Sequence, residues 1–329
     1  MSSTIFPPGG RRPGFERLKW FLVNCVCALV PSQKYRAFIR YYFMRYRVRL
    51  GHAPLPIKKR PRPIDLALCF DGRIVRPTGV TLASLLVNSK NRASYNIHCV
   101  VADSVTPEMR AGLTDLVRGL DPGSAIRFLE ANHDFDLCLP GNLSLTTYPW
   151  AFRLMLPALL PELDETIYAD TDVIFCRDLI ELADLDLGDN LLAGVRERPD
   201  GYINAGLMVM NLDRLRREKI YDTWIEKARR EQHQFPDQDI INRTCRGRII
   251  NLPVKYNFFH HMYHNLYRRG GITPQDHHDL KYNVVMVHYA CCVPKPWLEK
   301  RFYMSKLWWE YARLTPFYED LRAELEAGG

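Results

Sequence analysis

The sequence lacks several patterns that define common functional classes. None of its nine cysteines forms a Cys-Xaa-Xaa-Cys pair, which argues against zinc ribbons. Neither GxxxxGKS/T nor GxGxxG follows any predicted strand, so P-loop and dinucleotide-binding enzymes are excluded. Internal repeats and low-complexity tracts are absent as well. What remains is a globular chain of 329 residues, consistent with 47% hydrophobic and 25% charged residues.

The N-terminal apolar run is too short to span a bilayer. Residues 20–30, WFLVNCVCALV, end before Pro31, whereas a spanning helix needs about 20 apolar residues. Arg17 and Lys19 precede the run as in a signal peptide, but no small-Xaa-small cleavage site follows, so secretion is disfavoured. Unpaired cysteines inside apolar runs, such as Cys69, fit a reducing compartment. We therefore expect a cytoplasmic protein.

Positive charge is concentrated at the N-terminus. Residues 1–63 hold fourteen Lys or Arg and one acid, a net +13; since the whole chain carries +8, the other 266 residues carry −5. Within this extension, residues 33–50 repeat tyrosine and phenylalanine at helical spacing between basic residues. Such a helix is typical of proteins that bind anionic membrane surfaces. We expect residues 15–50 to bind lipid and to hold the protein peripherally on the inner face of the membrane.

Two other uses of this extension stay open. The predicted helix at 33–50 can instead pack its aromatic stripe on the body, with its charges solvated. Basic and aromatic residues also suit nucleic acid, and a salt-sensitive affinity for DNA above that for anionic vesicles would favour this interpretation. It leaves the acidic body unexplained, so we expect no nucleic-acid partner.

The pattern predicts an α/β domain over residues 64–297, after a linker at 52–63 that is rich in proline and basic residues. Strands alternate with helices, which predicts right-handed βαβ units and a mainly parallel sheet with helices on both faces. The predicted strands are 65–70, 96–101, 125–129, 166–169, 191–195, 205–210, 249–252 and 284–289. The predicted helices are 80–88, 107–120, 150–160, 214–230 and 238–245. Residues 298–329 form an aromatic, helical tail.

Two carboxylates one residue apart follow the fourth predicted strand. Asp170 and Asp172 stand between apolar β-formers in TIYADTDVIF, where they are costly to desolvate unless a cation lies between them. Oxygen ligands suit magnesium, calcium or manganese; simple solvation at a strand end is the alternative. Because Asp-Xaa-Asp occurs four times in this chain, only the placement is informative. Asp71 directly follows the first strand, so these three carboxylates are expected to face one crevice.

Four further stretches carry polar groups beside predicted elements. They are INAGLMVMN at 203–211, Asp-Gln-Asp at 237–239, Val-His-Tyr at 287–289 and Lys-Pro-Trp at 295–297. The first places an amide beside two small residues, and the second opens a helix with an amide between two carboxylates. Each is weak alone, because a histidine at a strand end is more often a satisfied core residue than a ligand. Their order and spacing together are informative.

Together these motifs resemble glycosyltransferase family 8, the group of glycogenin and of bacterial lipopolysaccharide α-galactosyl- and α-glucosyltransferases. The resemblance covers residues 64–297. It implies a GT-A fold, a Rossmann-like, mixed, mostly parallel sheet flanked by helices, with a nucleotide-binding half at 64–190 and an acceptor half at 191–297. It also implies a retaining transferase that moves galactose or glucose from a UDP-sugar to a saccharide or lipid-linked acceptor, such as a lipopolysaccharide core, with Mn²⁺ or Mg²⁺.

The resemblance also implies roles for individual residues. Asp170, Asp172 and His288 would hold the metal ion, a ligand set consistent with Mn²⁺ or Mg²⁺. The residues implied in binding the donor are Cys69, Asp71, Arg73, Arg153, Asp170, Thr171, Asn204, Ala205, Asp237, Gln238 and Lys295. Of these, Lys295 would contact the diphosphate. The implied catalytic residues are Gln238, Asp237, Asp170 and Asp172.

The resemblance implies retention of configuration, with Gln238 and Asp237 at the donor hexose. A double displacement needs a carboxylate nucleophile, and the family position is occupied by the amide of Gln238. We therefore expect same-face attack by the acceptor hydroxyl, with the leaving phosphate as base and Gln238 stabilising the oxocarbenium-like centre. Asp237 stays open as a nucleophile. The negative charge that develops on UDP would be neutralised by the metal ion and Lys295.

Two positions depart from the family pattern. The family usually has a glycine shortly after the histidine, and here residues 290–294 are Ala-Cys-Cys-Val-Pro before Lys295. Arg196, followed by Glu197, stands where close relatives carry an aspartate, which predicts a different choice of donor or acceptor. The alternative function is a non-catalytic sugar-nucleotide-binding protein on the same fold. Manganese-dependent hydrolysis of a UDP-hexose without acceptor would exclude it.

Overall fold

The computed structural model describes residues 60–131, 149–230, 236–259, 272–290, 295–299 and 304–327, together with Leu22, Cys25, Val26 and Leu29. The predicted helix at 33–50, most of the apolar run at 20–30 and most of the linker lie outside the described residues. Within the described residues, no helix has the length and apolarity needed to cross a membrane. The described residues from 60 to 290, together with those from 295 on, group into one compact unit.

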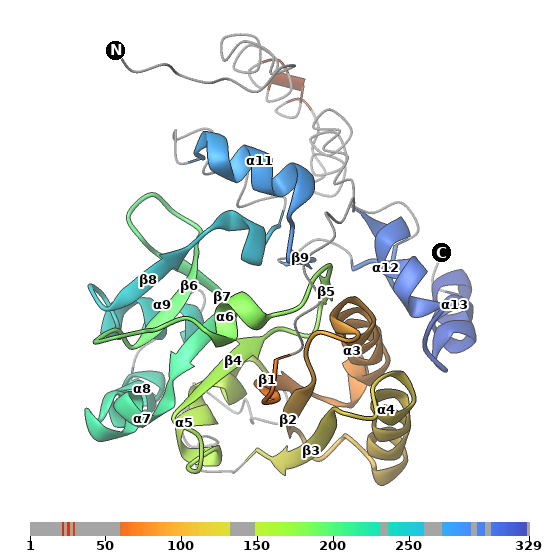
Figure 1. The fold of residues 1–329 in the computed structure, drawn as a ribbon, viewed down its shortest axis with the longest axis horizontal. Helices are drawn as coiled ribbons and strands as arrows, with labels where there is room; N and C mark the ends of the chain where they lie inside the picture. Colours follow the sequence, from red (N-terminus) through yellow and green to blue (C-terminus); the bar gives the residue numbers. More distant parts are fainter. Residues whose placement is uncertain are drawn as a thin grey trace. The chain divides into compact units, whose positions relative to one another are not determined.

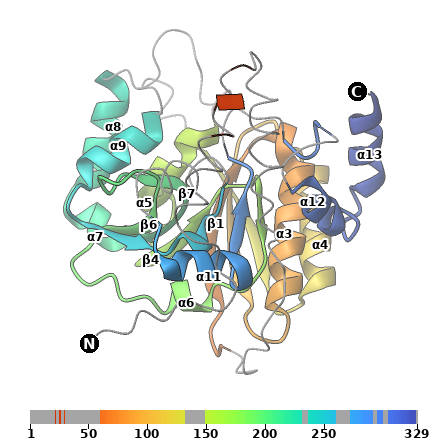
Figure 2. The same cartoon turned by 90° about the horizontal axis from the view of Figure 1, so that it is seen from above.

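A seven-stranded mixed sheet forms the centre of this unit (Figures 1 and 2). Its strand order is β3-β2-β1-β4-β7-β6-β8. The strands are β1 Ile64–Phe70, β2 Tyr95–Val101, β3 Ala125–Glu130, β4 Glu165–Ala169, β6 Leu192–Arg196, β7 Ile203–Asn211 and β8 Ile249–Leu252. Strands β3, β2, β1 and β4 are parallel, β7 is antiparallel to β4 and β6, and β6 is parallel to β8. This confirms the predicted mixed, mostly parallel sheet.

The register of β1 and β4 brings their polar ends together. Leu68 of β1 pairs with Ala169 of β4, so the two strands end at the same edge of the sheet. In a parallel sheet the carboxyl ends form the usual ligand-binding edge. Asp71 and Asp170, which follow the two strands, therefore emerge at one level.

A small second sheet extends this edge. After the aspartate pair the chain forms β5 (Val173–Phe175), which pairs antiparallel with β9 (Met286–His288). Val173 lies opposite His288 in this pairing. The pairing therefore carries the predicted third metal ligand, more than a hundred residues away in sequence, to the aspartates.

Helices cover both faces of the main sheet (Figure 2). One face carries α3 and α4, with α12 packed on α3, and the other carries α5, α7, α8 and α9. The α-helices are α3 Val75–Ser89, α4 Pro107–Leu120, α5 Leu156–Leu159, α6 Ile180–Ala183, α7 Leu212–Arg217, α8 Ile220–Arg230, α9 Pro236–Thr244, α11 Pro274–Tyr282, α12 Ser305–Ala312 and α13 Tyr318–Ala327. The 3₁₀ helices are η1 Gly72–Ile74, η4 Pro149–Met155 and η5 Val254–Tyr256.

Helix α4 shows how local signals set the bounds. The Thr106 side chain accepts a hydrogen bond from the Met109 backbone N–H at 3.3 Å, and Pro107 occupies the first turn. A missing N–H is harmless there, because the first amides of a helix have no partner within the helix. The predicted bounds of 107–120 and the cap are confirmed.

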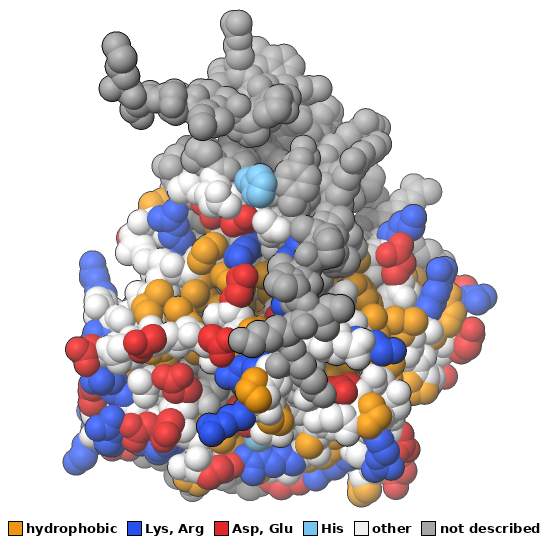
Figure 3. All heavy atoms as spheres, in the orientation of Figure 1, with side chains coloured by type: hydrophobic (Ala, Val, Ile, Leu, Met, Phe, Trp, Pro, Cys, Tyr) orange, Lys and Arg blue, Asp and Glu red, His pale blue; other side chains and the backbone are white. Residues whose placement is uncertain are grey.

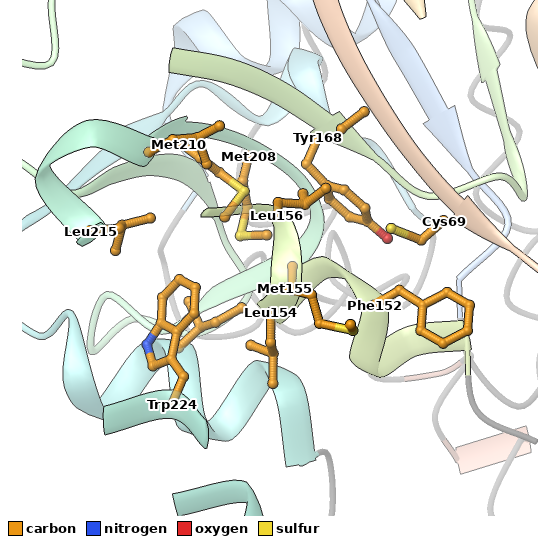
Figure 4. Close-up of a cluster of buried hydrophobic side chains, with 14 of the residues drawn as sticks. Cys69, Phe152, Leu154, Met155, Leu156, Tyr168, Met208, Met210, Leu215 and Trp224 are labelled. Atoms are coloured by element: carbon orange, nitrogen blue, oxygen red, sulfur yellow. The ribbon is translucent and has the colours of Figure 1, made fainter. Parts of the chain in front are cut away.

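A buried apolar cluster lies between the sheet and the helices of the second face (Figure 4). Leu154, Met155 and Leu156 of η4 and α5 contribute to it together with Met208 of β7 and Trp224 of α8, all completely buried. Each large side chain of this kind stabilises the fold by about 1.5–3 kcal/mol. The cluster fixes η4 against the sheet and so fixes Arg153, which belongs to the candidate site.

Several predicted elements differ from the observed ones. The helix expected at 150–160 is a 3₁₀ helix up to Met155, followed by one α-turn. The helix expected at 214–230 is two helices, because Lys219 adopts a left-handed conformation with φ 57°. The strand expected at 284–289 is observed over Met286–His288. Strand β5 and helix α11 were not predicted.

The described surface carries charges of both signs. Figure 3 shows acidic and basic side chains interspersed over the described part of the face it draws. Several form ion pairs, such as Arg214 with Asp189 at 3.0 Å and Arg248 with Glu218. Exposed pairs contribute little to stability. The mixture agrees with the small net charge expected beyond residue 63.

Candidate active site

A pocket of about 270 Å³ opens at the carboxyl ends of β1 and β4. The residues that line it are Cys69, Asp71, Arg73, Ile74, Arg153, Asp170, Thr171, Asp172, Lys295 and Trp297. All but Ile74 and Trp297 belong to the set named from the sequence. The pocket lining does not include the other members of that set, which are Asn204, Ala205, Asp237, Gln238 and His288. Trp297 completes the Lys-Pro-Trp motif, whereas nothing in the sequence singled out Ile74.

Asp170, Asp172 and His288 come together beside this pocket. One potential ligand atom from each lies within 4.8 Å of the others. The imidazole Nε2 of His288 is 3.1 Å from Asp172 Oδ1 and 3.4 Å from Asp170 Oδ2. Two carboxylates and one imidazole nitrogen form a hard oxygen and nitrogen donor set that suits a divalent ion such as Mn²⁺ or Mg²⁺. The residues present therefore fit the metal that the sequence predicts.

Cationic groups neutralise the two carboxylates. Burial raises the pKa of both aspartates, but Arg153 beside Asp170 and Lys295 beside Asp172 hold each pKa below its ordinary value. Burial lowers the pKa of His288, yet the carboxylate of Asp172 outweighs it and raises the pKa to about 9. A proton on His288 and the ammonium of Lys295 thus supply positive charge at the position where a divalent ion would bind.

Lys295 contacts the aspartate pair directly. Its Nζ donates to Asp172 Oδ2 at 2.7 Å and to the Tyr289 carbonyl oxygen at 2.6 Å. Lys295 therefore lines the pocket although the family's glycine is missing from the sequence before it. From here the side chain can contact an anion bound beside Asp172.

Arg153 connects the aspartate pair to the second half of the site. The guanidinium is 2.8 Å from Asp170 Oδ1 through one terminal nitrogen and 3.1 Å from Asp237 Oδ2 through Nε. The other terminal nitrogen donates to the Ala205 carbonyl oxygen at 2.9 Å, and the guanidinium lies 4.7 Å from the centre of the Tyr168 ring. Arg153, predicted as a donor-binding residue, thus also fixes the geometry of both carboxylates.

Asp71 and Arg73 form one end of the pocket. The Asp71 carboxylate accepts the Arg73 backbone N–H at 2.9 Å, which caps η1, and the Arg73 side chain at 2.8 Å and 2.5 Å. Asp71 is buried, whereas the Arg73 side chain is 71% exposed. Arg73 thus carries an exposed guanidinium, tethered to a buried carboxylate, in the lining of the pocket.

Gln238 is held in a network of neutral amides and one carboxylate. Its Oε1 accepts from the Ala205 backbone N–H at 3.0 Å and from Asn204 Nδ2 at 3.1 Å. Its Nε2 donates to Glu197 Oε2 at 3.0 Å. The neighbouring Asp237 is buried, which raises its pKa although Arg153 opposes the shift.

The structure brings in residues that the sequence did not assign. Glu197 contacts Gln238, and it follows the point where the pairing of β6 with β7 shifts register, between Gly194 and Arg196. Asn257, completely buried after η5, contacts His288 Nδ1 at 2.9 Å. No local sequence pattern could have identified Asn257, since its partners are distant in the chain.

Gly206 is the small residue on which the position of His288 depends. A Cβ at this position would lie 2.2 Å from His288 Cε1 and 2.7 Å from Nδ1. No side chain can be accommodated at such distances without moving the ring. The glycine beside Asn204, noted in the sequence only as a small residue, therefore makes room for the imidazole.

The fold and this site define a GT-A glycosyltransferase. The family described as Glycosyl transferase family 8 matches residues 65–301. The chain belongs to that family. The resemblance noted from the sequence is confirmed.

Individual relatives support this assignment. The lipopolysaccharide 1,2-glucosyltransferase of Escherichia coli K12 is 23% identical over 287 residues, 78% of this chain and 80% of its own length. Glycosyltransferase GlyE of Streptococcus pneumoniae is 29% identical over 173 residues, 49% of this chain and 40% of its own length. The chain thus matches about two fifths of the length of that relative.

Solved structures show the same fold. Galactosyltransferase LgtC, crystallised with donor and acceptor sugar analogs, superposes with a TM-score of 0.64 and 26% identity, covering 80% of this chain and all of LgtC. The bifunctional glycosyltransferase WbbM superposes with a TM-score of 0.66 and 21% identity, covering 84% of this chain and 53% of WbbM. The similarity to WbbM concerns the fold alone.

Proposed function

We propose that the protein is a metal-dependent, retaining glycosyltransferase that transfers galactose or glucose from a UDP-sugar to a saccharide or lipid-linked acceptor, such as a lipopolysaccharide core. The observation that carries this proposal is the cluster of Asp170, Asp172 and His288 beside a pocket of about 270 Å³. Lys295 forms an ion pair with Asp172 in the same place. The names of the glucosyltransferase and galactosyltransferase relatives favour a hexose donor.

Donor binding is assigned to the two ends of the pocket. Cys69, Asp71 and Arg73 line one part and would hold the nucleoside, while Thr171 lies between the two aspartates at the other part. A bound Mn²⁺ or Mg²⁺ supplies Lewis-acid stabilisation of the diphosphate. Lys295, whose ammonium is 2.7 Å from Asp172, would then exchange this contact for a phosphate oxygen.

Transfer proceeds on one face of the sugar. The acceptor hydroxyl oxygen bonds to the anomeric carbon as the bond from that carbon to the diphosphate breaks, and the electron pair leaves with UDP. The hydroxyl proton passes to the departing phosphate oxygen. Lys295 stabilises the charge on the leaving group, which is the charge that grows most in the transition state.

The contacts of Asp237 and Gln238 favour this course over double displacement. The Asp237 carboxylate is bonded to Arg153 at 3.1 Å, so it is held away from a nucleophilic role. The carbonyl oxygen of Gln238 is oriented by two donors, and the Glu197 carboxylate next to its amide adds negative charge. Together Gln238 and Glu197 would stabilise an oxocarbenium-like sugar. A covalent sugar adduct on Asp237 of the wild-type enzyme would reverse this choice.

The cellular setting is proposed from the sequence. Residues 1–63, of which 15–50 carry the basic aromatic segment, would hold the 64–297 catalytic domain and the 298–329 tail on the inner face of the membrane, close to a lipid-borne acceptor. Most of this segment lies outside the described residues. Flotation with anionic vesicles, compared with neutral vesicles and DNA, tests the assignment; preferential DNA binding would contradict it.

The activity is tested by incubating the protein with a panel of UDP- and GDP-sugars, with Mn²⁺ or with EDTA. We expect hydrolysis of UDP-galactose or UDP-glucose that requires the metal, because water can replace the acceptor. Absence of turnover with every donor, alongside measurable UDP binding, would support the non-catalytic sugar-nucleotide-binding alternative.

A further inference from the structure

A hydrogen-bonded series of amide groups, each with a fixed donor and acceptor end, begins at the backbone of β7. The Gly206 N–H donates to Asn204 Oδ1 at 3.0 Å, and the Ala205 N–H donates to Gln238 Oε1 at 3.0 Å. A backbone N–H can only donate, so both oxygen atoms are identified as acceptors. Asn204 Nδ2 donates to that same Gln238 oxygen at 3.1 Å. Both ends of the Asn204 amide are therefore fixed by atoms that cannot reverse their roles.

The next group in the series is the buried amide of Asn257. Asn257 Nδ2 donates to Asn204 Oδ1 at 2.9 Å, which leaves Asn257 Oδ1 directed at His288 Nδ1, also at 2.9 Å. A carbonyl oxygen can only accept, so Nδ1 of the imidazole carries a hydrogen. The lone pair of a neutral His288 is consequently on Nε2, the atom 3.1 Å from Asp172 Oδ1 and 3.4 Å from Asp170 Oδ2.

The backbone donors are available because the β6–β7 ladder is interrupted. Gly194 pairs with Met208 and Arg196 pairs with Ile203, so the register shifts across the stretch that contains Asn204 and its two neighbours. A bulge of this kind releases main-chain groups from the sheet. Here the released N–H groups bond side-chain oxygens of the site.

Packing keeps the side chains of Asn257 and His288 in place. Asn257 is completely buried and His288 is 3% exposed. Phe258, which follows Asn257, forms an isolated β-bridge to β9: its N–H donates to the Met286 carbonyl at 2.9 Å, and its carbonyl accepts the His288 N–H at 2.8 Å. The ring of Phe259 packs edge-on against the imidazole. The Asn257 amide is therefore shielded from solvent.

We propose that Asn257 is the positioning residue that fixes the tautomer of His288 for metal binding through Nε2, and that it joins the metal site to the amides of Asn204 and Gln238. The proposal rests on the metal site in the proposed function. A metal-binding histidine usually donates its other N–H to a fixed acceptor, and loss of that acceptor weakens metal affinity by roughly 10- to 100-fold. Metal and donor sugar would then be recognised by one connected network.

Two substitutions at Asn257 separate this role from simple packing. Asn257→Leu keeps the branched shape of the side chain and removes the acceptor, whereas Asn257→Asp keeps an oxygen for His288 Nδ1–H and removes the donor to Asn204. The dissociation constant of Mn²⁺ alone is measured for the full chain by electron paramagnetic resonance of free Mn²⁺, with circular dichroism and Tm as folding controls. We expect roughly 10- to 100-fold weaker Mn²⁺ binding for Asn257→Leu and affinity within about threefold of wild type for Asn257→Asp.

A purely structural role predicts the opposite order, because a buried carboxylate costs more stability than a leucine. Equal losses in both variants, or wild-type affinity in Asn257→Leu, would overturn the proposal. If Asn257→Leu does not fold, Asn204→Ala serves in its place: it frees the Asn257 amide to turn and should weaken Mn²⁺ binding, while unchanged affinity contradicts the proposal. A wild-type chain that binds no Mn²⁺ would defeat the metal site itself, which distinguishes that failure from failure of the Asn257 assignment.

Discussion

The two sides of the site are held by different forces. On one side Asp170, Asp172, Lys295 and protonated His288 form an ion cluster in which cations occupy the place of a metal. On the other side Asn204, Gln238 and Asn257 are bonded as neutral amides whose directions are set by the backbone. In the proposed function the first, charged side would rearrange when a divalent ion and a donor bind, whereas the second, amide side is already arranged. The amide side would then be the rigid side that holds the sugar, and the charged side the adaptable side that holds the diphosphate.

The strongest disruption of the charged side is loss of an aspartate. Asp172→Asn removes a ligand charge and the partner of Lys295, so we expect donor turnover to fall by roughly 100- to 1000-fold. Asp170→Asn should do the same. The measurement is Mn²⁺-dependent UDP release, with circular dichroism to establish that the fold is intact.

The matched control is Asp186→Asn, which changes an exposed aspartate in another Asp-Xaa-Asp tripeptide of the same chain. It should retain wild-type turnover. Activity preserved in either site variant would place the metal elsewhere.

The charged side should also respond to pH. The pKa of His288 is raised from 6.5 to about 9, so its contribution to stability is fully present below pH 6.5 and is lost as pH rises through 9. The loss is at most about 3 kcal/mol. Tm of the metal-free protein in EDTA should fall over this window, and His288→Gln should remove that part of the slope. A wild-type curve with no fall between pH 6.5 and 9 would contradict the ion cluster.

Gly206→Ala tests the contact between the two sides. The new Cβ would meet the His288 ring at 2.2 Å, so we expect a loss of roughly 1–3 kcal/mol in unfolding free energy together with weakened Mn²⁺ binding. Gly119→Ala is the control, since its Cβ meets nothing within 4 Å and it lies in helix α4. Unfolding in denaturant and Mn²⁺ titration are the measurements. If both variants behave alike, His288 does not need the space at Gly206.

Lys295→Ala should change two affinities in opposite directions. Without nucleotide it removes the cation that competes for Asp172, so Mn²⁺ should bind more tightly. In the presence of Mn²⁺ it removes a phosphate contact, so UDP should bind about tenfold more weakly, the size of one charge-assisted hydrogen bond. Calorimetric titrations measure both.

Lys255→Ala is the control for this comparison, because that lysine pairs with Glu181 at 2.9 Å outside the site. It should leave both affinities unchanged. A Lys295→Ala variant that binds Mn²⁺ and UDP as wild type does would show that the lysine contributes nothing to the adaptable side.

Glu197→Gln has the smallest expected effect. It keeps an oxygen for the Gln238 amide but removes the negative charge beside it, so kcat should fall by about tenfold while KM for the donor changes little. Steady-state kinetics separates the two constants. A change confined to KM would make Glu197 a binding residue only.

The nucleotide half of the fold was predictable because its signals are local. The apolar run of β1 and the cap of α4 at Thr106 gave nearly correct bounds. Helix α11 carried an equally local signal, a capping box at Thr273 followed by Pro274, and was missed although it was present in the sequence. Strand β5 was missed because three residues gain their structure only by pairing with β9.

The residues of the site also differ in whether a local sequence signal could identify them. The residues that follow strands, such as Asp71 and Asp170, could be predicted, because strand ends share an edge of the sheet. Glu197 and Asn257 could not, since one contacts Gln238 just after a register shift and the other depends on contacts with residues 31 and 53 positions away. Sequence patterns therefore identified the charged side of the site more completely than its amide side.

The central claim is that Asp170, Asp172 and His288 hold one divalent ion beside the donor diphosphate. Anomalous diffraction from crystals soaked with Mn²⁺ and UDP tests it most directly. We predict a single manganese peak bound by the two carboxylates and by Nε2 of His288, with Lys295 moved from Asp172 to a phosphate oxygen. A bound UDP with no manganese between these residues would contradict the account.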